Sequence, residues 1–151
     1  MSPEFTTFIH VSRPVREVYE AIADPNQLSR YFTTGGAQGR IETGATVTWD
    51  FHDFPGAFPV EVVEAIPQGQ IALRWGAKDA DAAENSMTDV TIKFEPTPDN
   101  RTKVSISERG WKQTDKGFAA SYGNCMGWSQ MLCALKVWLE HGINLREGAY
   151  K

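Results

Sequence analysis

Glu108 is the acidic residue of this sequence best placed to do chemistry. It follows Val104 and Ile106 at a spacing of two, so a strand over 104–108 would point all three side chains to one face. If that face is buried beside aromatic rings, a lone carboxyl group there would have a raised pKa and could act as a hydrogen-bond donor or general acid. The alternative is a register shift at Gly110 that turns Glu108 to solvent. The sequence leaves both interpretations open.

Five tryptophans are many for a chain of 151 residues, and three of them are expected to meet. Trp49 and Trp75 lie on the apolar sides of two predicted strands, and Trp128 lies on the apolar side of a predicted helix. One interpretation is plain core packing. The other is a ligand pocket lined by at least one indole, because a helix on a curved sheet can leave space beneath it. Trp138 is expected at the edge of the helix, where an exposed patch would serve self-association.

The histidines and the short motifs indicate no second reactive centre. His10, His52 and His141 lack the short separations of metal ligands, so we predict no metal site. His52 and Asp53 are expected to form a solvated turn. No nucleophile elbow, phosphate-binding glycine loop or dinucleotide fingerprint occurs in the sequence. We therefore predict no cofactor and assign no catalytic residue.

The composition is that of an ordinary globular chain, and its length suits one domain over residues 1–151. Hydrophobic residues make up 41% and charged residues 23%, with a net charge of −4. Scattered Lys and Arg argue against nucleic acid or an anionic membrane as a partner. No apolar stretch approaches the ~20 residues of a membrane span. The first residues lack the apolar region of a secretory signal, so we expect a cytoplasmic protein.

An α+β succession of elements must position these residues. Alternating apolar residues predict a first strand over 5–11. Ser12 is placed to cap a following helix, Pro14 suits the first turn of that helix, and the helix should end at Asp24. A second short helix is predicted over 26–32.

The middle of the chain has the period-two pattern of strands. They are predicted over 46–52, 58–66, 71–75, 90–94 and 104–108. Broken alternation within 58–66 predicts a bulge, and the short turns between strands predict an antiparallel sheet. Residues 77–85 are expected to form a polar, solvated loop.

Residues 115–142 are predicted to form one long amphipathic helix that ends at a glycine cap, Gly142. At 100° per residue, one arc of roughly 80° holds Cys125, Trp128, Leu132, Leu135 and Leu139, which should face the sheet. Phe118, Tyr122 and Met131 should border whatever space remains under the helix. Gln130, Ala134, Glu140 and His141 are expected to face solvent. A helix this long needs a broad apolar surface, and the sheet is the only candidate.

Cys125 and Cys133 are predicted to be free thiols. They are eight positions apart, which is about 12 Å along a helix, whereas a disulfide needs Cα atoms within ~7 Å. We expect both to be small, buried or half-buried helix residues.

The order of these elements resembles the helix-grip fold of the START and birch-pollen-allergen-like superfamily. Gly-Trp-Ser-Gln-Met-Leu over 127–132, followed by Leu135 and Leu139, resembles the Gly-Trp-x-x-x-Leu helix of the heat-shock-protein-90 ATPase activator homologue family. The turn and strand over 67–75 and the hairpin over 90–104 resemble that family as well. The resemblance implies two short helices after strand one and a curved antiparallel sheet of about six to seven strands around the long helix.

The resemblance also implies a pocket between the helix and the sheet. The eukaryotic protein that gives the family its name stimulates the ATPase of a chaperone, together with a separate partner domain. The resemblance therefore implies a chaperone as partner and a role in stress response.

We therefore predict that the protein binds a small hydrophobic or amphipathic molecule between the long helix and the sheet. The expected ligand-binding residues are Trp49, Phe51, Trp75, Phe94, Glu108, Phe118, Tyr122, Trp128 and Met131. One alternative is a cyclase or lyase in which Glu108 transfers a proton. Another is a protein that acts on a chaperone. Trp138 and the 77–85 loop leave room for a homodimer.

Overall fold

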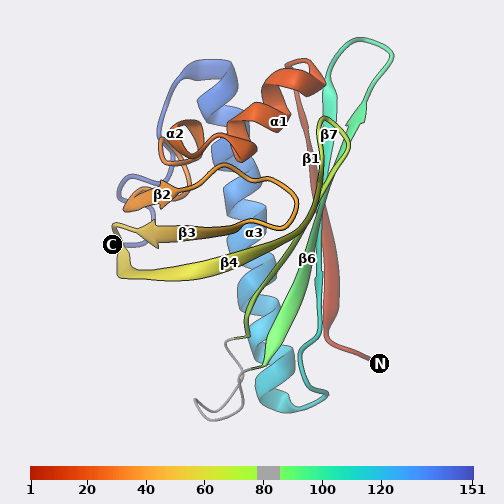
Figure 1. The fold of residues 1–151 in the computed structure, drawn as a ribbon, viewed down its shortest axis with the longest axis vertical. Coiled ribbons are helices and arrows are strands. Elements are labelled where there is room, and N and C mark those ends of the chain that lie inside the picture. The colour runs from red at the N-terminus through yellow and green to blue at the C-terminus, as the bar shows by residue number, and fades with distance from the viewer. Residues whose placement is uncertain (78–85) are drawn as a thin grey trace.

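The computed structural model describes residues 1–77 and 86–151, which form three helices and a seven-stranded antiparallel sheet (Figure 1). The elements are β1 (Glu4–Val11), α1 (Val15–Ala23), α2 (Pro25–Leu28), β2 (Gly36–Gln38), β3 (Thr46–Phe51), β4 (Phe54–Ile66), β5 (Gln70–Gly76), β6 (Met87–Pro96), β7 (Thr102–Arg109) and α3 (Asp115–His141). The strand order is β1-β7-β6-β5-β4-β3-β2. This confirms the predicted α+β helix-grip fold. The loop predicted over 77–85 lies, from residue 78 on, outside the described residues.

The sheet curves around α3, so its strands meet the helix at different angles. In Figure 1, β1, β6 and β7 run nearly along the helix axis, whereas β3 runs nearly across it. Among the strands, β1 makes the most extensive contact with α3. The curvature is helped by two irregularities in β4, one against β3 and one between Val62 and Glu64 against β5. The second confirms the predicted bulge.

The predicted long helix is confirmed, and both of its ends are capped. Thr114 accepts a hydrogen bond from the backbone N–H of Gly117 at 3.0 Å. Gly142 adopts a left-handed conformation, with φ of 68°, and its N–H donates to the carbonyl of Trp138 at 2.8 Å. A glycine is favoured there because a left-handed residue with a Cβ is strained. None of the described helices is long and apolar enough to cross a membrane.

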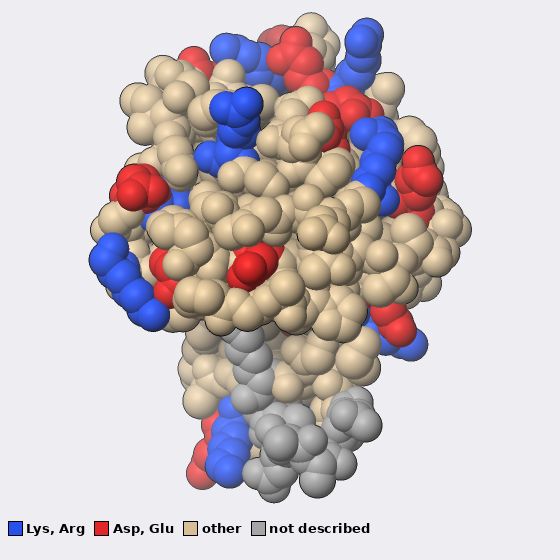
Figure 2. Space-filling model, turned by 60° about the vertical axis from the view of Figure 1, so that its left-hand side comes forward, with Lys and Arg blue, Asp and Glu red and all other residues tan. Residues whose placement is uncertain are grey.

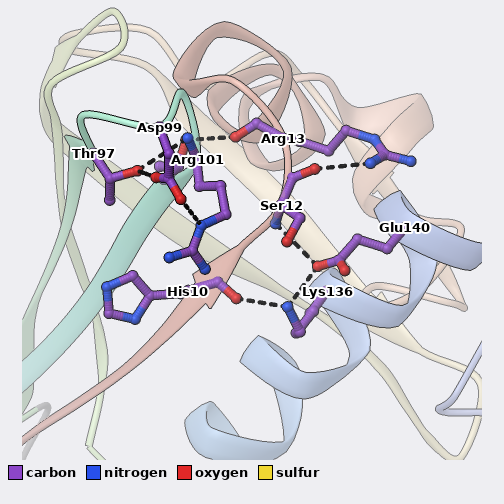
Figure 3. Close-up of polar contacts among 9 residues, drawn as sticks. His10, Ser12, Arg13, Thr97, Asp99, Arg101, Lys136 and Glu140 are labelled. Atoms are coloured by element: carbon purple, nitrogen blue, oxygen red, sulfur yellow. Dashed lines mark hydrogen bonds and ion pairs between the residues drawn. The ribbon is translucent and has the colours of Figure 1, made fainter.

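The solvent face expected for α3 is wrong in two places. Ala134 is buried, with 5% of its surface exposed, because residues 145–150 return along this side of the helix. The Glu140 side chain is only 14% exposed and takes part in a polar network with β1 and the segment after it (Figure 3).

Ser12, which was predicted to cap α1, belongs to this network instead, because α1 begins only at Val15. Its backbone N–H donates to Glu140 Oε2 at 3.0 Å, and Pro14 takes the N-cap position without a side-chain hydrogen bond. Lys136 Nζ donates to Glu140 Oε2 at 2.7 Å and to the carbonyl of His10 at 2.9 Å (Figure 3). Partial burial acts to raise the pKa of Glu140, but hydrogen bonds from Lys136 and Ser12 outweigh it and hold the pKa below its ordinary value. The network fastens the C-terminal half of α3 to the end of β1.

Two local predictions need correction, and one strand was not predicted. The second helix spans Pro25–Leu28 rather than 26–32, because Asp24 caps it at Asn26 N and places its start one residue earlier. The three-residue strand β2 is too short to show alternation and was not predicted. Cys133 is exposed rather than buried or half-buried, whereas Cys125 is half-buried as predicted, and both are free thiols as predicted.

Candidate ligand-binding site

Glu108 is buried, with 1% of its surface exposed. In the sheet register it stands between Phe5 of β1 and Val90 of β6, so β7 keeps its alternation to the end. The alternative that a register shift turns it to solvent is therefore wrong. Gly110, whose φ of 116° is readily adopted by glycine, comes after the strand and not within it.

Four side chains donate hydrogen bonds to the Glu108 carboxyl group. Oε2 accepts from Trp75 Nε1 at 2.8 Å and from the Thr88 hydroxyl at 2.6 Å. Oε1 accepts from Trp128 Nε1 at 2.9 Å. The Asn124 amide nitrogen lies 3.1 Å from both oxygens. The donors come from β5, β6 and α3, so the carboxyl group joins the sheet to the helix.

Such a set of donors suits an ionised carboxylate. An indole N–H and an amide NH₂ can only donate, and a carboxylate offers about four acceptor sites. Among the described residues, no Lys, Arg or His forms an ion pair with Glu108. Charge-assisted hydrogen bonds therefore offset the cost of burying the charge. With both oxygens occupied, Glu108 holds the indoles of Trp75 and Trp128 in fixed orientations.

The three tryptophans meet as predicted. The ring centroids of Trp75 and Trp128 are 5.3 Å apart, those of Trp49 and Trp75 are 5.9 Å apart, and those of Trp49 and Trp128 are 6.5 Å apart. Phe32 packs on Trp128 at 5.5 Å and on Trp49 at the same distance. These distances are those of favourable aromatic pairs. The cluster is a rigid junction between α3 and the sheet.

A pocket of about 680 Å³ lies beside this junction, between α3, the β3–β4 turn and residues 146–150. Six aromatic rings line it: Phe32, Phe51, Phe54, Trp75, Trp128 and Tyr150. The left edge of Figure 1, which carries the β3–β4 turn and the C-terminus, comes forward in Figure 2. There a broad upper part of the molecule overhangs a narrower lower part, and uncharged surface dominates the middle of the view.

The helix side of the pocket is hollow because α3 presents small residues there. Ala119, Ala120, Gly123 and Gly127 line the pocket. A Cβ placed on Gly123 or Gly127 would meet no atom within 4 Å, so both glycines face open space. Their spacing of three and four residues puts them along one side of a helix. That spacing was a usable signal in the sequence, and the predicted pocket residues do not include these positions.

The outer wall of the pocket contains an ion pair that the sequence did not indicate. Arg146 donates to the Asp53 carboxylate through Nε at 2.9 Å and through Nη2 at 2.7 Å, across 93 positions of sequence. The Arg146 guanidinium also lies 4.4 Å from the ring of Phe51 and 4.7 Å from that of Tyr150. The pair anchors the segment after α3 to the β3–β4 turn.

Asp53 therefore does not belong to a solvated turn as predicted, since only 6% of its surface is exposed. Burial acts to raise the pKa of the Asp53 carboxyl group, but the hydrogen bonds and charge of Arg146 outweigh it and hold the pKa below its ordinary value. His52 lies at the surface, with its Nε2 3.8 Å from Glu147 Oε2.

The predicted ligand-binding residues fall into separate groups. Phe51, Trp75 and Trp128 line the pocket, and Glu108 lies one layer behind the two indoles. Met131 lines a second hollow of about 400 Å³, on the side of α3 where residues 145–150 return.

The other predicted ligand-binding residues lie away from the pocket lining. Trp49 and Phe94 are core residues, and Phe94 packs on Tyr19 with ring centroids 5.1 Å apart. Phe118 is half-buried. Tyr122 is 69% exposed. It precedes Asn124 by two positions, a rotation of about 200° on a helix, so it lies away from the pocket side.

The titratable residues that the structure describes do not assemble into a metal centre. Within residues 1–77 and 86–151, no group of three or more His, Cys, Asp or Glu side chains is arranged to hold a metal ion.

A curved antiparallel sheet closed by one long helix, with an aromatic pocket at their junction, defines a helix-grip protein. Within this class the chain belongs to the family described as Activator of Hsp90 ATPase homolog 1-like protein, whose model matches residues 12–140. No curated protein matches the chain.

Solved structures share the fold. The protein SSP2350 from Staphylococcus saprophyticus is 27% identical, with a TM-score of 0.79 over 95% of this chain and 96% of that one. The Aha1 dimer from Colwellia psychrerythraea is 20% identical, with a TM-score of 0.72 over 92% of this chain and 97% of that one. DynU16, from the dynemicin biosynthetic locus, is 22% identical, with a TM-score of 0.78 over 95% of this chain and 49% of that one.

Proposed function

We propose that this protein binds a small hydrophobic or amphipathic molecule in the pocket between α3, the β3–β4 turn and residues 146–150. The observation that carries the proposal is a pocket of about 680 Å³ with six aromatic rings in its lining. Pockets for small molecules are typically concave and apolar, with few polar groups. A ligand that buries roughly 200 Å² of apolar surface would gain about 5 kcal/mol before the cost of association.

The surroundings of the pocket support binding because they hold its walls in place. The Glu108 carboxylate fixes the indoles of Trp75 and Trp128, and the pair of Asp53 and Arg146 fixes the opposite wall. A preorganised wall loses little conformational entropy when a ligand arrives. We place this function in the cytoplasm.

Filling the hollow side of α3 tests the proposal. Gly123→Leu should place a side chain in the pocket without a clash, because a Cβ at this position meets nothing within 4 Å. We expect the neutral dye Nile red to bind the natural protein with a micromolar Kd and to bind Gly123→Leu at least about tenfold more weakly. Thermal unfolding should show that the variant remains folded.

Two control variants separate pocket filling from a general effect on the helix. Tyr122→Leu adds a leucine to the exposed side of α3, where Tyr122 is 69% exposed, and should leave dye binding unchanged. Gly123→Ala adds one methyl group and should weaken binding only slightly. Failure of the natural protein to bind any apolar probe, or equal binding by Gly123→Leu, would refute the proposal.

An enzymatic role as a cyclase or lyase is the second candidate, and burial of Glu108 favours it. Against it, Trp75, Trp128 and Asn124 stand between the carboxylate and the pocket. Turnover of an aromatic polyketide-like substrate by the natural protein, abolished in Glu108→Gln, would establish it.

A role on a chaperone is the third candidate, and the family supports it. Two exposed apolar residues, Phe54 and Met126, border the pocket and could contact a protein partner. A pull-down with purified chaperone, repeated with Phe54→Ser, would test it. Light scattering of the same samples would test a homodimer.

A further inference from the structure

We propose that Asn124 presents a hydrogen-bond acceptor to the ligand, so the pocket selects molecules whose polar end is a donor. Such ends are hydroxyls, phenols and protonated amines, in contrast to carboxylates. The proposal rests on the proposed function, since it concerns the same pocket.

The orientation of the Asn124 amide follows from its contact with Glu108. Its nitrogen lies 3.1 Å from both carboxylate oxygens, and rotating the amide by half a turn would place its own oxygen against them. Because that arrangement sets acceptor against acceptor, the carboxylate fixes the amide. Asn124 lines the pocket and is half-buried, and its Oδ1 accepts no hydrogen bond from any described residue. The free acceptor is therefore available to a ligand.

The negative charge of Glu108, which lies behind Asn124, also favours a hydrogen-bond donor. The Glu108 carboxylate is buried, and its partners within the described residues are neutral: two indoles, a hydroxyl and an amide. A buried charge without a counter-ion acts strongly on neighbouring groups because the surrounding dielectric is low. A ligand carboxylate next to Asn124 would meet this negative charge as well as the Asn124 oxygen, whereas a hydroxyl or an ammonium group would be attracted.

Among the described residues, the two cations of the pocket lining, Arg146 and Lys116, lie elsewhere. Arg146 is paired through two nitrogens with Asp53 on the outer wall. Lys116 also lines the pocket but precedes Asn124 by eight residues on α3, about 12 Å along the axis. A ligand with one polar end at Asn124 thus does not reach Lys116 with that end.

A matched series of naphthalenes tests the selectivity by isothermal titration calorimetry. The probes are 2-methylnaphthalene, 2-naphthylmethanol, protonated 2-naphthylmethylamine and 2-naphthoate, which share one apolar body and differ at the end. We expect the alcohol and the ammonium to bind about tenfold or more tightly than 2-naphthoate. The first two would donate a hydrogen bond to Asn124 Oδ1, whereas the carboxylate would set one acceptor against another. Equal or tighter binding of 2-naphthoate would overturn the inference.

The variant Asn124→Leu keeps the size of the side chain and removes the acceptor. Within this variant, the affinity for the alcohol should no longer exceed that for its apolar parent 2-methylnaphthalene, whatever the absolute affinity of the altered pocket. An unchanged preference would contradict the role of Asn124. If the variant does not fold, the ranking in the natural protein still decides. Failure of all four probes, including 2-methylnaphthalene, would instead count against the proposed function.

Discussion

The two halves of α3 serve different purposes although they belong to one uninterrupted helix. The C-terminal half packs large apolar side chains against the sheet, with Leu132 and Leu135 at most 1% exposed. The N-terminal half presents Ala119, Ala120, Gly123 and Gly127 to a pocket. Large side chains of one half fill the core, whereas small side chains of the other border the pocket of about 680 Å³. Side-chain volume, rather than helix geometry, decides where a cavity forms.

The polar contacts of the two halves differ as well. The C-terminal half is fastened by the surface network of Lys136 and Glu140, which reaches His10 and Ser12 (Figure 3). Further toward the N-terminus, Asn124 and Trp128 donate to the buried carboxylate of Glu108. The helix thus depends on packing near its end and on a buried polar contact near the pocket.

The largest effect is expected from truncating the packed half. Leu135→Ala removes a fully buried side chain and should lower the free energy of unfolding by about 2–5 kcal/mol, because it leaves a cavity in the core. Met126→Ala in the other half, where the side chain is 57% exposed, should change it by less than about 0.5 kcal/mol. Urea denaturation measures both. Equal losses would break the comparison between the halves.

Glu108→Gln should have the next largest effect, on the junction beside the pocket. The side-chain amide of the new glutamine carries N–H donors. They would face other donors, namely the indoles, the Thr88 hydroxyl or the Asn124 amide. We expect a loss of about 1.5–3 kcal/mol, the range for a hydrogen bond to a charged group, and an altered near-ultraviolet circular dichroism of the tryptophans. Glu64→Gln, at an exposed position of β4, is the control. An unaltered tryptophan spectrum would show that Glu108 does not fix the indoles.

Two glycines of the same helix should respond to alanine with opposite signs. Gly123→Ala, within the helix and facing open space, should raise stability by about 0.5–1 kcal/mol because glycine is a poor helix former. Gly142→Ala should lower it by about 1 kcal/mol, because φ at this C-cap is 68°. Thermal unfolding of both variants gives the signs. A loss of stability in Gly123→Ala would mean that the pocket side of α3 has no spare room.

The smallest effect concerns pH and the C-terminal network. Because the pKa of Glu140 is lower in the folded protein, its contribution to stability is present above the unfolded value of about 4.3 and is lost as the pH falls through the folded value. For a pair of this kind we expect about 0.3–0.5 kcal/mol. Glu140→Gln should therefore be less stable than the natural protein at neutral pH, and the difference should shrink near pH 3. Urea midpoints at the two pH values measure it, and a difference that persists in acid would contradict the ion-pair explanation.

Much of the fold could be predicted because its signals are local. The period of two in the strands, the period of 3.6 in residues 115–142 and the glycine at 142 are each read within a few residues. The convergence of Trp49, Trp75 and Trp128 followed from placing those two patterns face to face. The bulge in β4 was visible as broken alternation.

The site could be predicted only in part, because its decisive contacts join distant segments. Arg146 and Asp53 are 93 positions apart, and each reads as an ordinary surface charge in its local sequence. Tyr122 was expected to border the pocket from its position on the helical wheel, yet the pocket lies on the side of Asn124 and Gly127. Choosing between these two sides requires knowing how α3 is rotated against the sheet.

The sequence by itself determined the class of fold and the long helix, because alternation and helical periodicity are properties of neighbouring residues. It left open whether Glu108 faces the core or solvent. Only the tertiary structure decided that Glu108 is buried, that four uncharged side chains donate to it, and that small residues on α3 open a pocket beside the indoles. Those outcomes depend on how a curved sheet and a helix meet, and no local pattern records that geometry.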